Sequence, residues 1–247
     1  MNERAREEIG YRDFRGMRVA SVFHRCEPDT RAVVVMAHGF KSNKIGPSRY
    51  FVDLSRALAE RGVSSLRFDQ PGCGDSEGAF EESSFFTWID TIESFARQFH
   101  TEGRAVALLG QSMGGNASLA AAARLDNAIA GVALWSAGTN VRTDAASLEG
   151  EWMEEEGQRV RTDFWREAAS LDFLALYRGL AAPVYIVYGT ADVFIPAADA
   201  RTVESMCKPG DRIRVIEGLP HSAWPEPHRS EILAETADTL VSWLADA

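Results

Sequence analysis

The length and the charge of the chain limit its fold class and its partners. Its 247 residues, of which 45% are hydrophobic, are enough for the core of a single α/β domain over residues 1–247. The formal net charge of −10 repels phosphate groups, so we expect neither nucleic acid nor an anionic membrane as a partner.

The first part of the chain predicts a hairpin that is followed by alternating strands and helices. Polar and apolar residues alternate over residues 11–24 around Arg15-Gly16, as in an antiparallel hairpin. The continuous apolar run at 32–36 is typical of a strand buried on both faces, and it leads to His38-Gly39-Phe40. The next expected elements are a helix at 47–62, a strand at 63–68, a loop at 69–76 and a helix with an aromatic stripe at 85–99.

Residues 110–115 read Gly-Gln-Ser-Met-Gly-Gly, between the apolar run 105–109 and the alanine-rich segment 116–125. This order predicts a strand, a sharp turn and a helix, which is the context of a nucleophile elbow. The glycines permit a turn so tight that the Ser112 hydroxyl is exposed at the carboxyl end of the strand. The same turn places the Met113 N–H at a helix start, where it can stabilise a developing negative charge.

The rest of the chain predicts three further strands and a final helix. Strands are expected at 129–135, 183–188 and 213–216, and an amphipathic helix at 232–244. The alternation of strands and helices implies a mostly parallel sheet that is covered by helices on both faces.

A connection of about 45 residues separates the strands at 129–135 and 183–188, and so long a connection usually has a function. Apolar residues at spacings of three and four predict two short helices there, with the acidic run 154–156 on a solvated face. We expect a small helical lid at about 139–180. Its bulky side chains, candidates for an apolar or aromatic acyl pocket or for packing within the lid, are Trp152, Met153, Phe164 and Trp165.

A serine hydroxyl needs a base to accept its proton and a carboxylate to orient that base. Asp192 follows the strand at 183–188, and His221 follows the strand at 213–216. Both loops come after the carboxyl ends of strands, the edge of the sheet that presents Ser112. The chain order Ser, Asp, His predicts a catalytic triad of Ser112, Asp192 and His221.

Other residues compete for these roles. His38 is expected to brace its loop rather than to act as the base. Three histidines are expected to have surface roles: His24, His100 and His228. Two aspartates are expected to tighten a glycine-rich turn: Asp69 and Asp75.

Acyl transfer also requires two N–H donors that are directed at the oxyanion. Met113 supplies one because it follows the nucleophile directly. Phe40, in the loop after the first parallel strand, is placed to supply the other.

Several motifs together resemble the α/β-hydrolase superfamily, and within it small serine esterases of the feruloyl/cinnamoyl esterase and monoacylglycerol lipase-like kind. The motifs, which extend from about residue 30 to the C-terminus, are His38-Gly39-Phe40, the loop at 67–76, Gly110–Gly115, Gly189–Asp192 and His221. The resemblance implies the α/β-hydrolase fold with a short insert in the position of a lid. Gln111 stands where many relatives carry histidine, which leaves the triad intact.

Cysteine usage and hydropathy bear on the compartment. The three cysteines lie far apart without metal-type spacing, the N-terminal residues are charged, and no apolar run approaches membrane-spanning length. We therefore expect a soluble cytoplasmic protein without a metal or another cofactor. A homodimer is one assembly that the sequence allows.

Three functional hypotheses follow. In the first, the protein is a serine hydrolase that cleaves a small-molecule carboxylic ester with an apolar or aromatic acyl group. In the second, a biosynthetic enzyme uses the same residues for acyl transfer, thioester release or elimination of an acyl group such as acetate. In the third, the chain is a non-catalytic binder, which would have no need to keep Ser112, Asp192 and His221 together.

Overall fold

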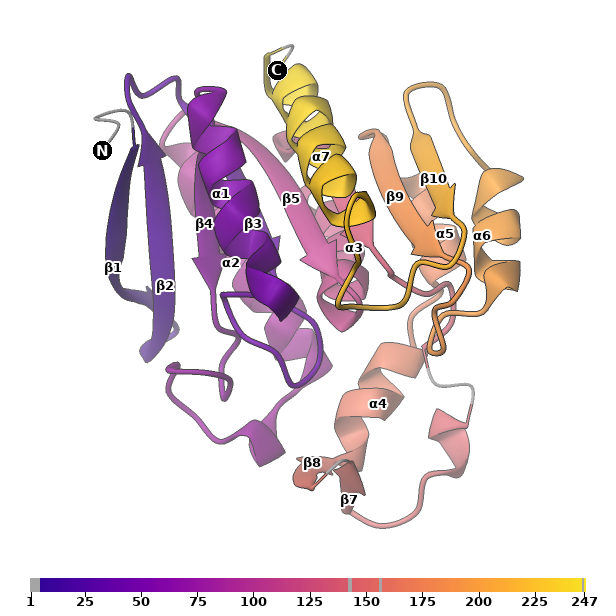
Figure 1. Ribbon diagram of the computed structural model, residues 1–247. Helices are drawn as coiled ribbons and strands as arrows, with labels where there is room; N and C mark the ends of the chain where they lie inside the picture. The colour runs from indigo at the N-terminus through magenta and orange to yellow at the C-terminus, as the bar shows by residue number, and fades with distance from the viewer. Residues whose placement is uncertain (1–4, 142–143, 156, 246) are drawn as a thin grey trace.

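A central sheet of eight strands forms the core of the protein in the computed structural model, which describes residues 5–141, 144–155, 157–245 and 247. The strands of this sheet are β1 (Ala5–Phe14), β2 (Met17–Cys26), β3 (Ala32–Ala37), β4 (Ser64–Phe68), β5 (Ala105–Gln111), β6 (Gly131–Trp135), β9 (Val184–Gly189) and β10 (Arg212–Ile216). Their order is β1-β2-β4-β3-β5-β6-β9-β10 (Figure 1). β2 pairs antiparallel with β1 and β4, and every later pair is parallel.

Helices cover both faces of this sheet. They are α1 (Tyr50–Glu60), α2 (Phe85–Thr101), α3 (Met113–Leu125), α4 (Thr162–Ala169), α5 (Phe173–Gly179), α6 (Ala197–Glu204) and α7 (His228–Ala245). In Figure 1, α1 and α7 lie in front of the sheet and α2 and α3 lie behind it. The mostly parallel sheet with helices on both faces confirms the predicted fold class. No helix in the described ranges combines the length and the apolar character that a membrane span requires.

The apolar run at 32–36 shows why the central strands are continuously hydrophobic. Val33 and Val35 of β3 pack into the core beneath α2 and α3. Val34 and Met36, which point to the opposite face, pack into the core beneath α1 and α7. Alternate residues therefore meet different helical layers, and both sets need apolar side chains.

The helix expected from Pro47 begins in two steps. A 3₁₀ turn, η1 (Pro47–Arg49), comes first, and α1 follows. Ser48 and Arg49 have φ angles of +48° and +65°, so a regular helix cannot pass through them. The prediction located this helix correctly and its first turn incorrectly.

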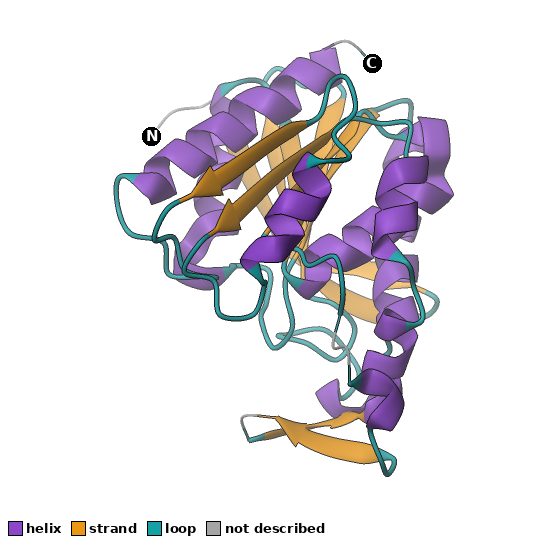
Figure 2. Ribbon diagram, turned by 90° about the vertical axis from the view of Figure 1, so that its right-hand side faces the viewer, coloured by secondary structure: helices purple, strands orange, loops and turns teal. Residues whose placement is uncertain are grey.

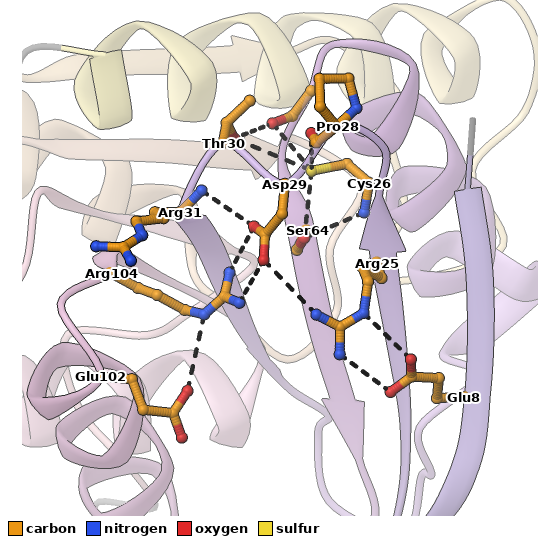
Figure 3. A network of polar contacts seen from close by, with 11 residues as sticks. Glu8, Arg25, Cys26, Pro28, Asp29, Thr30, Arg31, Ser64, Glu102 and Arg104 are labelled. Carbon is orange, nitrogen blue, oxygen red and sulfur yellow. Dashed lines mark hydrogen bonds and ion pairs between the residues drawn. The ribbon is translucent and has the colours of Figure 1, made fainter.

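Ion pairs tie the N-terminal hairpin to the sheet at the end opposite the carboxyl ends of the parallel strands (Figure 3). The Arg104 guanidinium donates hydrogen bonds of 2.8 and 2.6 Å to the two carboxylate oxygens of Asp29. Arg25 on β2 lies 3.6 Å from Asp29 and donates to Glu8 on β1. The hydrogen bonds from Arg104 hold the pKa of Asp29 below its ordinary value, so the carboxylate remains charged and paired.

The segment between β6 and β9, residues 136–183, is an insert that extends from the carboxyl edge of the sheet (Figure 2). It contains the two expected short helices, α4 and α5. It also contains a hairpin that was not predicted, formed by β7 (Trp152–Glu155) and β8 (Gln158–Arg161). Residues 142, 143 and 156 of the expected lid lie outside the described residues.

Contacts between charged residues anchor this insert to the core. Arg159 and Arg161 of β8 reach Glu81 and Glu82 of the 3₁₀ turn η2 (Phe80–Glu82), at 2.8 and 3.3 Å. The carboxylate of Glu167 on α4 accepts a hydrogen bond of 2.8 Å from the N-cap hydroxyl of α2. The insert is therefore attached on the side of the sheet that α2 covers.

Candidate active site

Ser112 occupies a sharp turn between β5 and α3. β5 ends at Gln111, α3 begins at Met113, and Ser112 between them has φ +52° and ψ −126°. Its backbone N–H donates a 2.8 Å hydrogen bond to the carbonyl oxygen of Trp135, at the end of β6. A left-handed φ angle in a residue other than glycine is strained, and the surrounding hydrogen bonds and packing maintain it.

Two glycines of this turn are required by close backbone approach. A Cβ atom at Gly110 would lie 2.2 Å from the carbonyl oxygen of Gly114. A Cβ atom at Gly114 would lie 2.2 Å from the carbonyl oxygen of His38, at the end of β3. No side chain fits at either position, because the atoms in the way belong to backbone.

The structure brings together the three residues that the sequence predicts as a triad. The Ser112 hydroxyl oxygen lies 3.0 Å from Nε2 of His221, and Nδ1 of His221 lies 2.7 Å from Oδ2 of Asp192. His221 comes from the loop between β10 and α7, and Asp192 from the loop between β9 and α6. Three separate loops at the carboxyl edge of the sheet thus form one continuous chain of hydrogen bonds.

The environment of Asp192 keeps it ionised. Its side chain is only 1% exposed, and burial alone would raise its pKa. The hydrogen bond from His221 and two backbone N–H bonds of 2.9 Å, from Phe194 and Ile195, outweigh burial and place the pKa below its ordinary value. A charged Asp192 accepts a hydrogen bond from Nδ1–H of His221, which leaves Nε2 free to accept the proton of the Ser112 hydroxyl.

His38 has the bracing role expected for it. Its Nε2 accepts a 2.9 Å hydrogen bond from the N–H of Gln70, and its Nδ1 donates to the carbonyl oxygen of Gly39 at 2.8 Å. Burial lowers the pKa of His38, in agreement with a neutral ring that donates at one nitrogen and accepts at the other. The ring also packs edge-on against Trp88, with centroids 5.5 Å apart. These contacts hold the loop that carries Phe40.

Asp69 ties the glycine-rich turn to the neighbouring loop, as expected. Its side chain is completely buried, and it accepts hydrogen bonds from the backbone and the ammonium group of Lys44, both at 2.6 Å. It also accepts the N–H of Asp75 at 2.9 Å. Asp69 is therefore committed to structure, and it is not the partner of His221.

One of the histidines expected to have a surface role is buried instead. His24 is 4% exposed because β2 is paired on both edges, with β1 and with β4. The expectation of a surface role for His24 was therefore wrong, because β2 lies inside the sheet and is contacted by α1. His100 is exposed, and His228 is partly exposed.

The two expected oxyanion donors, Phe40 and Met113, line the same cavity as Ser112. Within the described residues, neither backbone N–H has a hydrogen-bond acceptor in the protein. The Phe40 ring is held by aromatic contacts with Phe164 and Trp165 of α4, at centroid distances of 5.1 and 4.8 Å. The insert therefore packs directly on the residue that carries one of these N–H groups.

The cavity above Ser112 has a volume of about 530 Å³. Insert residues Val141 and Trp165 form part of its wall, and Phe194 and Ile195 from the loop after β9 form another part. Asn116 and Asn140 add polar groups. Lys41 and Glu155 also line the cavity, so the site combines apolar side chains with polar and charged ones.

Of the four side chains proposed for the acyl pocket, Trp165 is the one that the structure places in the cavity wall. Phe164 is fully buried behind it. Met153 is partly buried against the hydrophobic core, and Trp152 lies in the hairpin beneath the guanidinium groups of β8. In the described part of the chain, these three residues do not line the cavity, although Glu155 of β7 does.

Phe194 was missed by sequence reasoning. It follows Asp192 by two residues, and its ring contacts the His221 ring at a centroid distance of 4.9 Å. The signal was present, because three apolar residues follow the acidic residue in a loop that would otherwise be expected to be polar. Periodicity does not detect such a short segment.

Comparisons with known proteins identify the family of this chain. A family model described as serine aminopeptidase, S33, matches residues 28–169. Alpha/beta hydrolase domain-containing protein 17B of Xenopus tropicalis is 24% identical over 215 residues, which cover 85% of this chain and 67% of that protein.

Solved structures share the fold at low sequence identity. Est1E from Butyrivibrio proteoclasticus with ferulic acid bound superposes with a TM-score of 0.84 at 20% identity, over 95% of this chain and 99% of that chain. A monoacylglycerol lipase from Paleococcus ferrophilus superposes with a TM-score of 0.74 at 20% identity, over 91% and 99% of the two chains.

Proposed function

Because this chain belongs to the α/β-hydrolase family described as serine aminopeptidase, S33, we propose that it is a serine hydrolase that cleaves a carboxylic ester. The observation that carries the proposal is the hydrogen-bonded chain from Ser112 through His221 to Asp192 at the floor of the cavity. A solvent-accessible serine with a base and a buried carboxylate in this order is equipped for nucleophilic acyl transfer.

In this mechanism, the Ser112 oxygen attacks the ester carbonyl while His221 accepts the hydroxyl proton. The N–H groups of Phe40 and Met113 donate hydrogen bonds to the oxyanion that forms, and the start of α3 adds its dipole. His221 then returns the proton to the leaving alcohol. A water molecule, deprotonated by His221, hydrolyses the acyl-Ser112 ester and releases the acid.

We propose an apolar or aromatic acyl group for the substrate. Trp165 and Val141 offer apolar surface in the cavity, and the Phe40 ring stands beside them. Est1E, a structural relative with 20% identity, binds ferulic acid, which is an aromatic acid. The expected lid at about 139–180, which lies within the insert, then covers the part of the cavity that holds the acyl group.

Acyl transfer uses the same acyl-enzyme, and when an acceptor other than water enters, the product is a new ester or thioester. Elimination forms no acyl-enzyme: His221 removes a proton from the carbon next to the one that bears the ester oxygen, the bond between that carbon and the oxygen breaks, and the acyl group leaves as a carboxylate while a double bond forms in the rest of the substrate. A non-catalytic binder would bind esters without releasing anything. We also propose that the enzyme is cytoplasmic.

Product analysis separates these outcomes. We expect purified protein to convert a series of acyl esters to free acid, identified by mass spectrometry, with incorporation of one ¹⁸O atom from labelled water. Ser112→Ala is the matched control and should release no acid above the uncatalysed rate. Ester turnover without labelled acid would favour transfer or elimination, and tight binding without turnover would favour the binder.

A further inference from the structure

An exposed aromatic side chain stands at the mouth of the cavity, beside His221. Phe194 is 67% exposed and lines the cavity, whereas its neighbour Val193 is 85% exposed and is not among the described residues that line it. A single exposed apolar residue is ordinary on a protein surface. Phe194 differs because its ring contacts the imidazole of His221, at 4.9 Å between centroids and an interplanar angle of 64°.

The backbone of this segment is fixed by the same carboxylate that orients His221. Oδ1 of Asp192 accepts the N–H groups of Phe194 and Ile195, both at 2.9 Å, while Oδ2 contacts His221. The Ile195 side chain packs against the hydrophobic core. Phe194 therefore presents its ring from a short segment that is anchored on both sides of the exposed residue.

The chemistry of the proposed mechanism identifies which part of an ester meets this ring. The proton on Nε2 of His221 must pass to the oxygen of the leaving alcohol, so that alcohol has to lie next to the imidazole. The oxyanion faces the N–H groups of Phe40 and Met113, and Trp165 packs on the Phe40 side. Phe194, which contacts the His221 ring, therefore lies on the side where the leaving alcohol must be, whereas Trp165 contacts the Phe40 ring.

We propose that Phe194 forms a subsite for the alcohol part of the substrate and selects an aromatic alcohol. This inference rests on the proposed ester hydrolysis and extends it from the acyl group to the alcohol. An aromatic ring that stacks on Phe194 removes apolar area of both rings from water and gains an aromatic contact. The substrate then covers the surface of Phe194 that is exposed in the free protein.

The same subsite has a second consequence. Acylation and its reverse pass through the same transition states, so a site that holds a leaving alcohol also holds an acceptor alcohol. When the acceptor attacks acyl-Ser112, its hydroxyl proton passes to His221, the new ester bond forms, and the bond to Ser112 breaks as its oxygen regains the proton. Aromatic alcohols should therefore compete with water for the acyl-enzyme.

Esters that differ in the alcohol alone test the proposal. Ethyl, cyclohexylmethyl and benzyl acetate have the same acyl group and alcohols of similar acidity. In Phe194→Ala the ratio of kcat/KM for benzyl acetate to that for ethyl acetate should fall about 10-fold, and the ratio for cyclohexylmethyl acetate should fall less. Val193→Ala, the matched control outside the cavity wall, should keep all three ratios. An unchanged benzyl-to-ethyl ratio in Phe194→Ala overturns the proposal, as does an equal fall in Val193→Ala.

A partition experiment adds an independent measurement. An acetyl-enzyme formed from p-nitrophenyl acetate is exposed to benzyl alcohol, and the ratio of benzyl acetate to acetate is measured. This ratio should fall about 10-fold in Phe194→Ala, because the acceptor loses its contact. An unchanged ratio contradicts the subsite. If the wild-type protein forms no acetyl-enzyme at all, the proposed ester hydrolysis is wrong. If the wild-type protein hydrolyses esters normally but Phe194→Ala does not change the preference for the alcohol, only the subsite is wrong.

Discussion

Trp165 and Trp152 offer a direct comparison of pocket and scaffold within the insert. Trp165 is 8% exposed and lines the cavity, and Trp152 lies in the hairpin against the guanidinium groups of Arg159 and Arg161. We expect Trp165→Ala to weaken turnover of esters with bulky acyl groups selectively. Trp152→Ala is the matched control, because it removes the same side chain from the outer hairpin.

The expected size follows from the contact that an acyl ring can make. An aryl ring placed against one face of the indole buries roughly 60 Å² of apolar area, which contributes about 1.5 kcal/mol at 25 cal/mol per Å². That free energy corresponds to a factor of about 10 in kcat/KM. An acetyl group is too short to make most of this contact, so it should lose much less.

The assay is kcat/KM for p-nitrophenyl esters from acetate to 3-phenylpropanoate, with folding of each variant checked by circular dichroism. The alcohol is constant, so the acyl-size dependence isolates the acyl side. Trp165 also contacts the Phe40 ring at 4.8 Å, so its loss could act through the Phe40 N–H. An equal loss for all acyl sizes would show that second route and refute the pocket role. The same selective loss in Trp152→Ala would refute the assignment of the two tryptophans.

Three further outcomes are expected. Asp192→Asn should lower kcat about 10⁴-fold while the protein stays folded, because the amide favours the wrong imidazole tautomer; a loss below tenfold in steady-state kinetics would point to a different orienting group. Gly114→Ala should cost about 3 kcal/mol in urea unfolding, since its Cβ would lie 2.2 Å from the backbone oxygen of His38, directly after β3. Gly179→Ala is the control, because its Cβ would meet no described atom within 4 Å, and it should lower the free energy of unfolding much less. Equal urea midpoints for the two variants would contradict this account. Hydrogen bonds from Arg104 lower the pKa of Asp29 in the folded state. The ionised carboxylate therefore stabilises the folded state at pH values above the ordinary aspartate pKa, and this stabilisation is lost as the pH falls through the pKa of Asp29 in the folded protein. In acid unfolding curves Asp29→Asn should therefore flatten the loss of stability below about pH 5, and an unaltered curve would count against the pair.

The elbow was predictable because its constraints are local. The apolar run, the glycines and the alanine-rich helix stand next to one another in the chain, and each has a single physical reason. The structure adds the distances, such as the 2.2 Å between a Cβ atom built at Gly110 and the carbonyl oxygen of Gly114, which excludes a side chain there. The positions of Asp192 and His221 followed from a topological rule, since parallel strands bring their carboxyl ends to one edge.

The insert was harder to predict, because its periodicities are short. β7 and β8 have four residues each, too few for the alternation of a strand to be distinguished from the spacing of a helix. Gly157, which has φ +76° in the turn of the hairpin, was the available signal. Without the hairpin, Trp152 and Met153 remained candidates for the acyl pocket as well as for packing within the lid. Tertiary contacts, which decide the cavity wall, are not encoded in local spacing.

The central claim is that Ser112 is the nucleophile of an ester hydrolase, and the covalent intermediate tests it most directly. After rapid mixing with p-nitrophenyl acetate and acid quench, peptide mass spectrometry should find one acetyl group on Ser112. The adduct should be absent from Ser112→Ala, and it should accumulate slowly in His221→Ala because the base is missing. An acetyl group on another residue that forms at the rate of turnover, or full turnover by Ser112→Ala, would contradict the account.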